Sequence, residues 1–481
     1  MRVCLLTTSL VNAGPATHIT IPQDVVACIV RVLEGGRSMN GMMTNTRQRL
    51  NKLFFGWWIV FSGFLLQAVN GGLLFHGFTV YFLPLQQEFG WSRALVATGF
   101  TLTRAEGALI GPLEGWAIDK FGPRIIVVVG IILFGAGFIA FSATNSVLHY
   151  FLAFLLLSLG SSLGGFLPVS ATITNWFARK RALALGIAMT GMGIGGLVVP
   201  VLAWSITTYG WRPTAFASGI LVWAIGIPSA LLLRHKPEPY GYLPDGAQQA
   251  PAAGPSAPDT RQPQTTSPTP ASDDFTVKEA LKTPAFWLIS GGHAAALLVV
   301  AAVSLHQIPH MVQRLDMSIE RASFFVAFLM VMTIVGQLGG GFLGDKINKK
   351  VLLVSCMLGH TAGLLSLAFA TSSIHLIAFG VLHGLAWGAR GPLMQSLRAD
   401  YFGRSSFATI MGFSSAIVTV GMIISPIFAG WMADIQDGSY TMAFTILAIL
   451  TGLGSFFFYF ANKPERKPRT PIGSPVVKAA S

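Results

Sequence analysis

In the sequence GPLEGWAIDKFGPR, residues 111–124, two spaced glycines, an Asp-Lys pair and a Gly-Pro-Arg triplet follow one another within one short segment. An apolar segment from about Ala94 runs into it, and a second one from Ile125 leaves it. Each is long enough to cross a membrane as a helix. We therefore expect a tight turn between two membrane-spanning helices, with the polar residues gathered at the turn.

The residues before and after this turn suit a closely packed helix end. Gly111 and Gly115 are four residues apart on one helical face, which lets a partner helix approach the backbone. Asp119 and Lys120 follow where the helix leaves the lipid. Arg124 comes directly after the turn, and we expect it to pair with Asp119.

The same pattern returns later in the chain at a constant offset in residue number, which we call the repeat offset. The residues opposite Gly115, Asp119, Lys120, Gly122 and Arg124 are Gly341, Asp345, Lys346, Asn348 and Lys350. The repeat offset also relates Gly186 to Gly412, Gly195 to Gly421 and Pro200 to Pro426. A register kept over two separate regions indicates a duplication, and repeated halves with several apolar spans each are typical of transporters.

Composition places the chain in a membrane. Of the 481 residues, 52% are hydrophobic and only 11% are charged, with a mean hydropathy of +0.62. Water-soluble proteins of this size carry about 25% charged residues. The three cysteines, Cys4, Cys28 and Cys356, have no metal-ligand or disulfide spacing, and we expect them to be inert.

The expected fold is an all-α membrane protein with twelve transmembrane helices in two six-helix pseudo-repeats. Each span has the roughly 20 apolar residues that a helix needs to cross a bilayer. The twelve spans are expected at about 54–74, 94–116, 125–143, 149–172, 183–205, 214–233, 285–305, 322–343, 351–371, 375–397, 406–430 and 441–461.

The remaining segments are polar. Residues 1–53 form a polar cytoplasmic extension before the first half (54–233), although Met39, Met42 or Met43 is an alternative start of the physiological protein. Residues 234–283, rich in Pro, Ala, Ser and Thr, read as a largely disordered cytoplasmic linker before the second half (284–461). Residues 462–481 form a cytoplasmic tail.

The net charge of +13 follows this topology. Nearly all Lys and Arg residues fall on the side that holds both predicted termini and the linker, and only Arg93, Arg212, Arg314 and Arg321 fall on the other. The positive-inside rule makes the basic side cytoplasmic. The basic charge therefore reports topology and lipid contact and gives no reason to expect nucleic-acid binding.

The spans, the six-plus-six repeat, the linker and the DKFGPR turn together resemble the major facilitator superfamily, over about residues 54–461. Finer features are GWW at 56–58, FGWSRA at 89–94 and WFARKRALALGIA at 176–188. These are similar to the monocarboxylate porter and oxalate/formate antiporter branch.

The resemblance implies alternating-access transport of a small organic anion, coupled to a proton or a counter-anion. It also implies that two sets of residues lock the inner gate while the outer gate is open: Gly115, Asp119, Lys120 and Arg124, and Gly341, Asp345 and Lys350. One departure concerns the substrate. Members of the branch carry a cationic residue in span eight or eleven, whereas residues 323–343 and 405–430 hold none here.

A charge in mid-membrane is costly and normally faces a cavity or a partner. Arg390, in the tenth span, shares one helical stripe with His383, Trp387 and Met394. Its guanidinium can hold a carboxylate by two parallel hydrogen bonds, and Trp387 can border the apolar part of the anion. The alternative is that Arg390 bonds to a backbone carbonyl and braces its own helix.

Further polar residues lie within the spans. Arg104 is a candidate second anion contact, and Glu106 a candidate proton-binding carboxyl whose pKa is raised by burial. Gln67, Asn70 and His293 are candidates for orienting the substrate. For each of them the alternative is a hydrogen bond that joins two helices.

No P-loop, metal-ligand cluster or nucleophile-base pair stands out in the sequence, so we expect neither an enzyme nor a cofactor or metal site. The expected function is a secondary active transporter for a small mono- or dicarboxylate, monomeric and multi-pass in the cell membrane. The alternatives are a drug or amphiphile exporter of the same fold and a membrane sensor that binds its ligand without transporting it.

Overall fold

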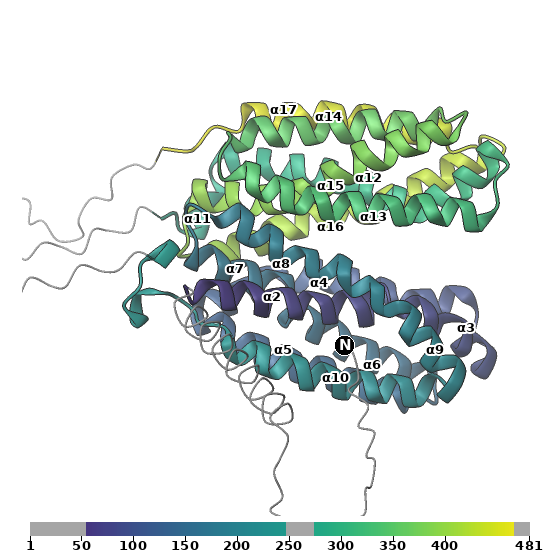
Figure 1. The fold of residues 1–481 in the computed structure, drawn as a ribbon, viewed down its shortest axis with the longest axis horizontal. Helices are drawn as coiled ribbons and strands as arrows, with labels where there is room; N and C mark the ends of the chain where they lie inside the picture. The colour runs from purple at the N-terminus through teal and green to yellow at the C-terminus, as the bar shows by residue number, and fades with distance from the viewer. Residues whose placement is uncertain (1–53, 247–273, 466–481) are drawn as a thin grey trace, which may run out of the picture. The chain divides into compact units, whose positions relative to one another are not determined.

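The structure is a computed structural model that describes residues 54–246 and 274–465, and its regular elements are helices (Figure 1). The side chains at positions 93, 94, 97, 100–109, 319 and 320 lie outside this description. The predicted extension 1–53, the middle of the predicted linker and most of the predicted tail also lie outside it.

The first half begins with a long helix that contains one irregular turn. α2 (Gly56–Asn70) passes through a π-helical turn, η1 (Gly71–Phe75), and α3 (Phe78–Phe89) follows, so the first span runs past its predicted end at residue 74. Glycines at this turn let the backbone of α8 come close: a Cβ atom on Gly72 would lie 2.7 Å from the carbonyl oxygen of Gly195. The half continues with α4 (Arg93–Phe121), α5 (Pro123–Ser142), α6 (Val147–Leu163), α7 (Phe166–Trp176), α8 (Arg181–Gly195), η2 (Gly196–Val198), α9 (Val199–Tyr209) and α10 (Trp211–Leu232).

The second half follows the same order with fewer interruptions. In Figure 1 its helices, green to yellow, form one group and those of the first half, purple to teal, form another. The helices are α12 (Pro284–Leu315), α13 (Ile319–Gly344), α14 (Lys349–Ala368), α15 (Ser373–Phe402), α16 (Phe407–Asp434) and α17 (Thr441–Phe460).

The repeat offset seen in the sequence also relates the helices themselves. Moved by this offset, α5 coincides with α14 at both ends, and the pair α6 and α7 covers the same positions as α15. The first residues of α4 and α8 fall on those of α13 and α16. The duplication inferred from the sequence is therefore present in the helix boundaries.

Ten helical segments of the described chain are long and apolar enough to cross a membrane. The two other long helices are α4, of 29 residues, and α15, of 30 residues, at the second and tenth places in the order. α15 is less apolar because it carries buried polar side chains. With these two helices, the fold has the expected twelve.

Glycines let the halves meet at two helix pairs, α4 with α16 and α8 with α13. A Cβ atom on Gly115 would collide with the carbonyl oxygen of Ala408, and one on Gly341 would lie 2.7 Å from that of Ala182. Only glycine allows such an approach without a shift of the partner helix. The glycine spacing found in the sequence thus serves packing between the halves.

The described ends of the predicted linker are structured, contrary to the expectation for these residues. Short 3-10 turns, η3 (Glu238–Tyr240) and η4 (Pro244–Gly246), follow α10, and a capped helix, α11 (Val277–Leu281), precedes α12. These two ends bond to the helix bundle, while residues 247–273 lie outside the described part of the chain, so the disorder expected for them stays a prediction.

Candidate functional site

Asp119, at the end of α4, binds the first turn of a helix in the other half. Its carboxylate accepts hydrogen bonds from the backbone N–H groups of Ala408 (3.2 Å) and Thr409 (2.9 Å), and from the Thr409 hydroxyl (2.6 Å). These groups open α16, where backbone N–H groups have no partner within the helix and carry partial positive charge. Asp119 therefore supplies the acceptor that this helix end lacks.

Asp345, directly after α13, makes the equivalent contact in the opposite direction. Its carboxylate accepts hydrogen bonds from the backbone N–H groups of Ala182 (2.9 Å) and Leu183 (3.0 Å), in the first turn of α8. Burial raises the pKa of this carboxyl above its usual range, and the two N–H groups act against the rise. Each half thus holds a helix of the other through one aspartate.

The cations of the repeated motif have other partners than the sequence suggested. Among the described residues, no ion pair joins Arg124 to Asp119, so the predicted pair is wrong: α16 occupies the carboxylate instead. Lys120 lies over the ring of Trp116, 4.7 Å from its centroid. Lys350 donates a hydrogen bond of 3.0 Å to the Asn462 side chain.

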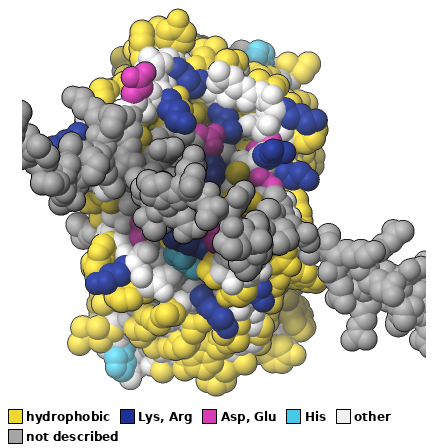
Figure 2. Space-filling model, turned by 90° about the vertical axis from the view of Figure 1, so that its left-hand side faces the viewer, with side chains coloured by type: hydrophobic (Ala, Val, Ile, Leu, Met, Phe, Trp, Pro, Cys, Tyr) yellow, Lys and Arg dark blue, Asp and Glu magenta, His cyan; other side chains and the backbone are white. Residues whose placement is uncertain are grey.

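We call the end of the helices that carries Asp119 and Asp345 the motif end. Figure 2 looks onto it and shows Lys and Arg side chains gathered there beside acidic ones. Two further contacts join the halves at this end. Arg181 forms an ion pair of 2.6 Å with Asp400, and Arg404 donates a hydrogen bond of 2.8 Å to the carbonyl oxygen of Asn175. The motif end is therefore closed in this conformation.

The two described linker ends bond to equivalent loops. Asp245 accepts hydrogen bonds from three backbone N–H groups at residues 178–180, at 2.8 to 3.3 Å. Asp274 accepts two from Arg404 and Ser405, at 3.0 and 2.8 Å. Burial lowers the pKa of the neighbouring His235 imidazole, with Lys236 adding to the effect. The repeat symmetry therefore extends into the linker.

Arg390, deep in α15, is the predicted site residue with the most unusual surroundings. Its side chain is buried, and within the described residues its Nε and Nη1 groups have no hydrogen-bond partner. Its charge acts on His293, His360, His383, Cys356 and Arg398. A buried guanidinium that has no carboxylate partner among the described residues favours the binding of an anion.

Arg398 is a member of this group that the sequence interpretation missed. The tenth span was expected to end at residue 397, which put Arg398 in a cytoplasmic loop, but α15 continues to Phe402 and buries the side chain. Nη2 lies 3.0 Å from Nδ1 of His293 and donates a hydrogen bond of 2.7 Å to the Ser414 hydroxyl. Nη1 is buried without a partner among the described residues.

His383 points into the second half, toward α14. Its Nδ1 lies 3.1 Å from Nδ1 of His360, and neither side chain is exposed. Trp387 packs into the apolar core formed by the surrounding helices, with its ring centroid 6.3 Å from that of His383. His383 and Trp387 thus face the core of their own half, and His360 is the contact that the sequence did not suggest.

The other candidates are more scattered. The Asn70 amide donates to the hydroxyl (2.7 Å) and the carbonyl oxygen (3.1 Å) of Ser161, a contact between α2 and α6. Gln67 is buried, and its Oε1 has no partner among the described residues. The side chains of Arg104 and Glu106 lie outside the described part of α4, so their predicted roles remain predictions.

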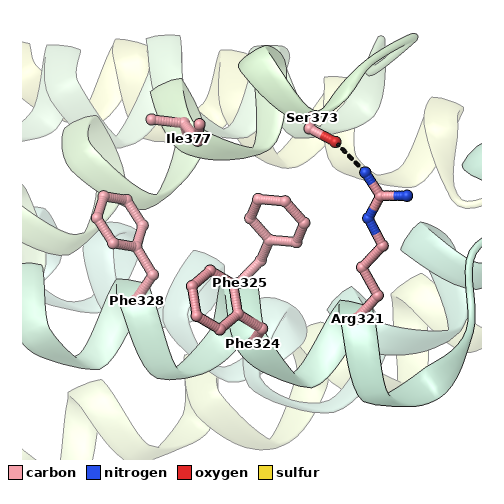
Figure 3. Close-up of a pocket in the computed structure, with 6 residues that line it drawn as sticks. All are labelled: Arg321, Phe324, Phe325, Phe328, Ser373 and Ile377. Atoms are coloured by element: carbon pink, nitrogen blue, oxygen red, sulfur yellow. Dashed lines mark hydrogen bonds between the residues drawn. The ribbon is translucent and has the colours of Figure 1, made fainter.

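A pocket lies away from Arg390 and Arg398, near the first residues of α13 and α15 (Figure 3). Phe324, Phe325, Phe328 and Ile377 line it with apolar side chains, and Arg321 bonds to the Ser373 hydroxyl at 3.1 Å. Phe324 is 69% exposed, so the pocket is open at the surface. Its lining suits apolar contacts and includes neither Arg390 nor Arg398.

Comparison with known proteins gives three relevant similarities. The Major Facilitator Superfamily profile matches residues 59–307 and 294–480. Monocarboxylate transporters 13 and 12 of Rattus norvegicus are 27% and 26% identical, covering 83% and 87% of this chain and 87% and 88% of those proteins. The crystal structure of the E. coli fucose:proton symporter aligns with a TM-score of 0.63 at 16% identity, over 84% of this chain and 98% of that one.

Proposed function

This chain belongs to the Major Facilitator Superfamily and is a transporter, not an enzyme, and on that premise we propose that it carries a small organic carboxylate by alternating access. The relatives named monocarboxylate transporters support this substrate class. We place the protein in the cell membrane as a monomer, with both termini and the motif end on the cytoplasmic side.

The observation that carries the proposal is the pair of buried guanidiniums on α15. Arg390 and Arg398 keep N–H groups without partners, and no ion pair in the described part of the chain joins either to a carboxylate. Burying an unpaired charge costs several kcal/mol. A carboxylate from solution would fill the vacant donor positions with charge-assisted hydrogen bonds and offset that cost.

The contacts at the motif end supply the gate. In the proposed cycle, Asp119 and Asp345 hold α16 and α8 while this end is closed, and the contacts break when the halves separate. Arg181 and Asp400 add an ion pair to the same closure. Coupling to a proton or a counter-anion provides the energy. A cluster of cations argues against a cationic drug as cargo.

The test is uptake of labelled formate, L-lactate and oxalate into proteoliposomes. We expect at least one of these anions to accumulate with the wild type and none with Arg390→Ala. Arg390→Lys should also fail, because a lysine cannot make the two parallel hydrogen bonds. Arg321→Ala, which removes an exposed arginine from α13, is the matched control and should transport normally. Equal uptake by Arg390→Ala and wild type would refute the proposed anion site.

A further inference from the structure

We infer that His360 and His383 form the proton-binding site of this carrier, and that the pair takes up a proton when a bound anion neutralises Arg390. The inference rests on the proposed function, because it needs an anion at Arg390. It chooses the proton from the two coupling ions that the proposed function leaves open, and it assigns the side chains that bind this proton.

The contact geometry requires a hydrogen bond between the two imidazole rings. Because the two Nδ1 atoms are 3.1 Å apart, one ring donates its Nδ1–H and the other accepts it. In the neutral pair, the donor ring then keeps an unprotonated Nε2, and the acceptor ring carries Nε2–H. Both Nε2 atoms are buried without a partner among the described residues. One additional proton can therefore bind at Nε2 of the donor ring without breaking the contact.

The charges around the pair provide the coupling. Arg390, on α15, is the charged group that acts on both imidazoles. The other titratable groups that interact with the charge of Arg390 are Cys356 on α14, His293 on α12 and Arg398 on α15. On the neighbouring helices, residues 324–344 of α13 and 441–460 of α17 contain no Lys, Arg, His, Asp or Glu. A free guanidinium repels the proton, and a carboxylate bound to it removes this repulsion.

The first half shows that the fold does not require imidazoles at these positions. Moved by the repeat offset, His360 falls on Phe134 and His383 on Leu157, and both of these side chains are buried. The helices concerned pack as neighbours in each half, α5 with α6 and α14 with α15. An apolar pair fills the site in one half, so the polar pair in the other has a role beyond packing.

A metal ion does not explain the pair. Within the residues that the structure describes, no three His, Cys, Asp or Glu side chains lie close enough to hold one. A proton needs only the free lone pair of one Nε2 atom, so the pair can bind it without a third ligand. A monocarboxylate and a proton would then cross together without net charge transfer.

The test is titration calorimetry of the detergent-purified protein with formate, L-lactate and oxalate, in buffers of different protonation enthalpy at one pH. The difference between buffers gives the protons taken up per anion bound. We expect about one proton per anion for the wild type, and an affinity that weakens as the pH rises, because proton and anion binding are reciprocally linked.

The decisive variant is the double substitution His360→Phe, His383→Leu, which copies the first half. It should bind the anion without proton uptake and with an affinity independent of pH. His383→Gln, which keeps a polar group, serves if the double variant does not fold. His375→Gln removes a half-buried histidine elsewhere on α15 and should behave as the wild type.

Proton uptake by the double variant or by His383→Gln equal to that of the wild type would overturn the inference. Anion binding by the wild type with no proton uptake would overturn it as well, while leaving the proposed function intact. Failure of all three anions to bind the wild type would instead refute the proposed function, and this inference with it.

Discussion

In the first half of the molecule, Gly164 and Gly165 separate α6 from α7, whereas at the equivalent positions of the second half Arg390 and Gly391 lie inside the unbroken helix α15. Arg398 and His293, which also lie near Arg390 in the second half, show the same contrast. Arg398 corresponds to Thr172, and His293 corresponds to Gln67. The buried cations Arg390 and Arg398 therefore have no charged counterpart at the equivalent positions of the first half, although the helices are duplicated.

The motif end shows the opposite relation, because its contacts occur in both halves. Asp119 binds α16 and Asp345 binds α8 through equivalent backbone groups. In the proposed cycle, closing the gate needs a contact from each half, whereas binding one small anion needs only one cluster of donors. On that proposal, the duplicated chain has kept its closing contacts in both halves and its anion-binding residues in one.

The largest expected effect on transport comes from replacing Arg398 by the threonine that stands at the equivalent position of the first half. Arg398→Thr should lower carboxylate uptake by about 100-fold, because a buried charge-assisted contact is lost. Uptake into proteoliposomes at equal protein incorporation measures this. Thr172→Lys, on the first half, should not restore it. Near-normal uptake by Arg398→Thr would mean that the asymmetry of charge is unrelated to transport.

A methyl group between the halves should have the next largest effect. Gly115→Ala forces α4 away from the carbonyl oxygen of Ala408, and overpacking of this kind costs about 1–3 kcal/mol. We expect turnover to fall by roughly tenfold or more. Gly341→Ala should be milder, since its Cβ would lie 2.7 Å from its own partner oxygen. Gly339, with open space around it, is the control position for the same substitution.

Substitutions of Asp119 and Asp345 should slow turnover to different degrees. Asp119→Asn should slow turnover by about tenfold with little change in anion affinity, because hydrogen bonds to a charged acceptor are worth about 1.5–3 kcal/mol. Asp345→Asn should slow it less, because Asp119 also accepts the Thr409 hydroxyl and Asp345 has no such third bond among the described residues. Steady-state exchange at saturating anion separates turnover from affinity.

The control for this pair is Thr409→Val, which removes the additional hydroxyl. It should weaken the contact of Asp119 with α16, so that its strength comes closer to that of the contact of Asp345 with α8. If Asp119→Asn instead left turnover unchanged and abolished anion affinity, Asp119 would act in binding and the gate assignment would be wrong.

The smallest effect is expected at Asn70. Its amide joins α2 to α6 through Ser161, so Asn70→Ala should lower the free energy of unfolding by about 1 kcal/mol and leave anion affinity unchanged. Thermal unfolding in detergent and calorimetric titration measure the two quantities. A large loss of anion affinity at an unchanged free energy of unfolding would show instead that Asn70 contacts the substrate.

Much of the fold was predictable because repeats, glycine spacing and apolar runs leave strong patterns. The correspondence of Asp119 with Asp345 followed from the repeat offset, whereas their role at the gate was implied only by the resemblance and stays a proposal. Their partners did not follow, because a helix N-terminus in the other half is invisible in local sequence. Proximity along the chain suggested Arg124 instead, which was wrong.

The candidate site was only partly predictable, for a similar reason. Arg390, His383 and His293 stand out as polar residues within apolar spans. Arg398 lies past the last apolar residue of its span, so hydropathy put it outside the membrane, whereas packing extends and buries α15. His360 sits on a neighbouring helix, and no sequence pattern joins it to His383.

The most direct test of the central claim, that the second half binds an anion through its buried arginines, is a thermal-shift measurement of the purified protein with formate, L-lactate and oxalate. A ligand that binds only the folded state raises the melting temperature. We predict that at least one carboxylate stabilises the wild type and Arg321→Ala, and stabilises neither Arg390→Ala nor Arg398→Thr. Equal stabilisation of all four proteins would contradict the claim.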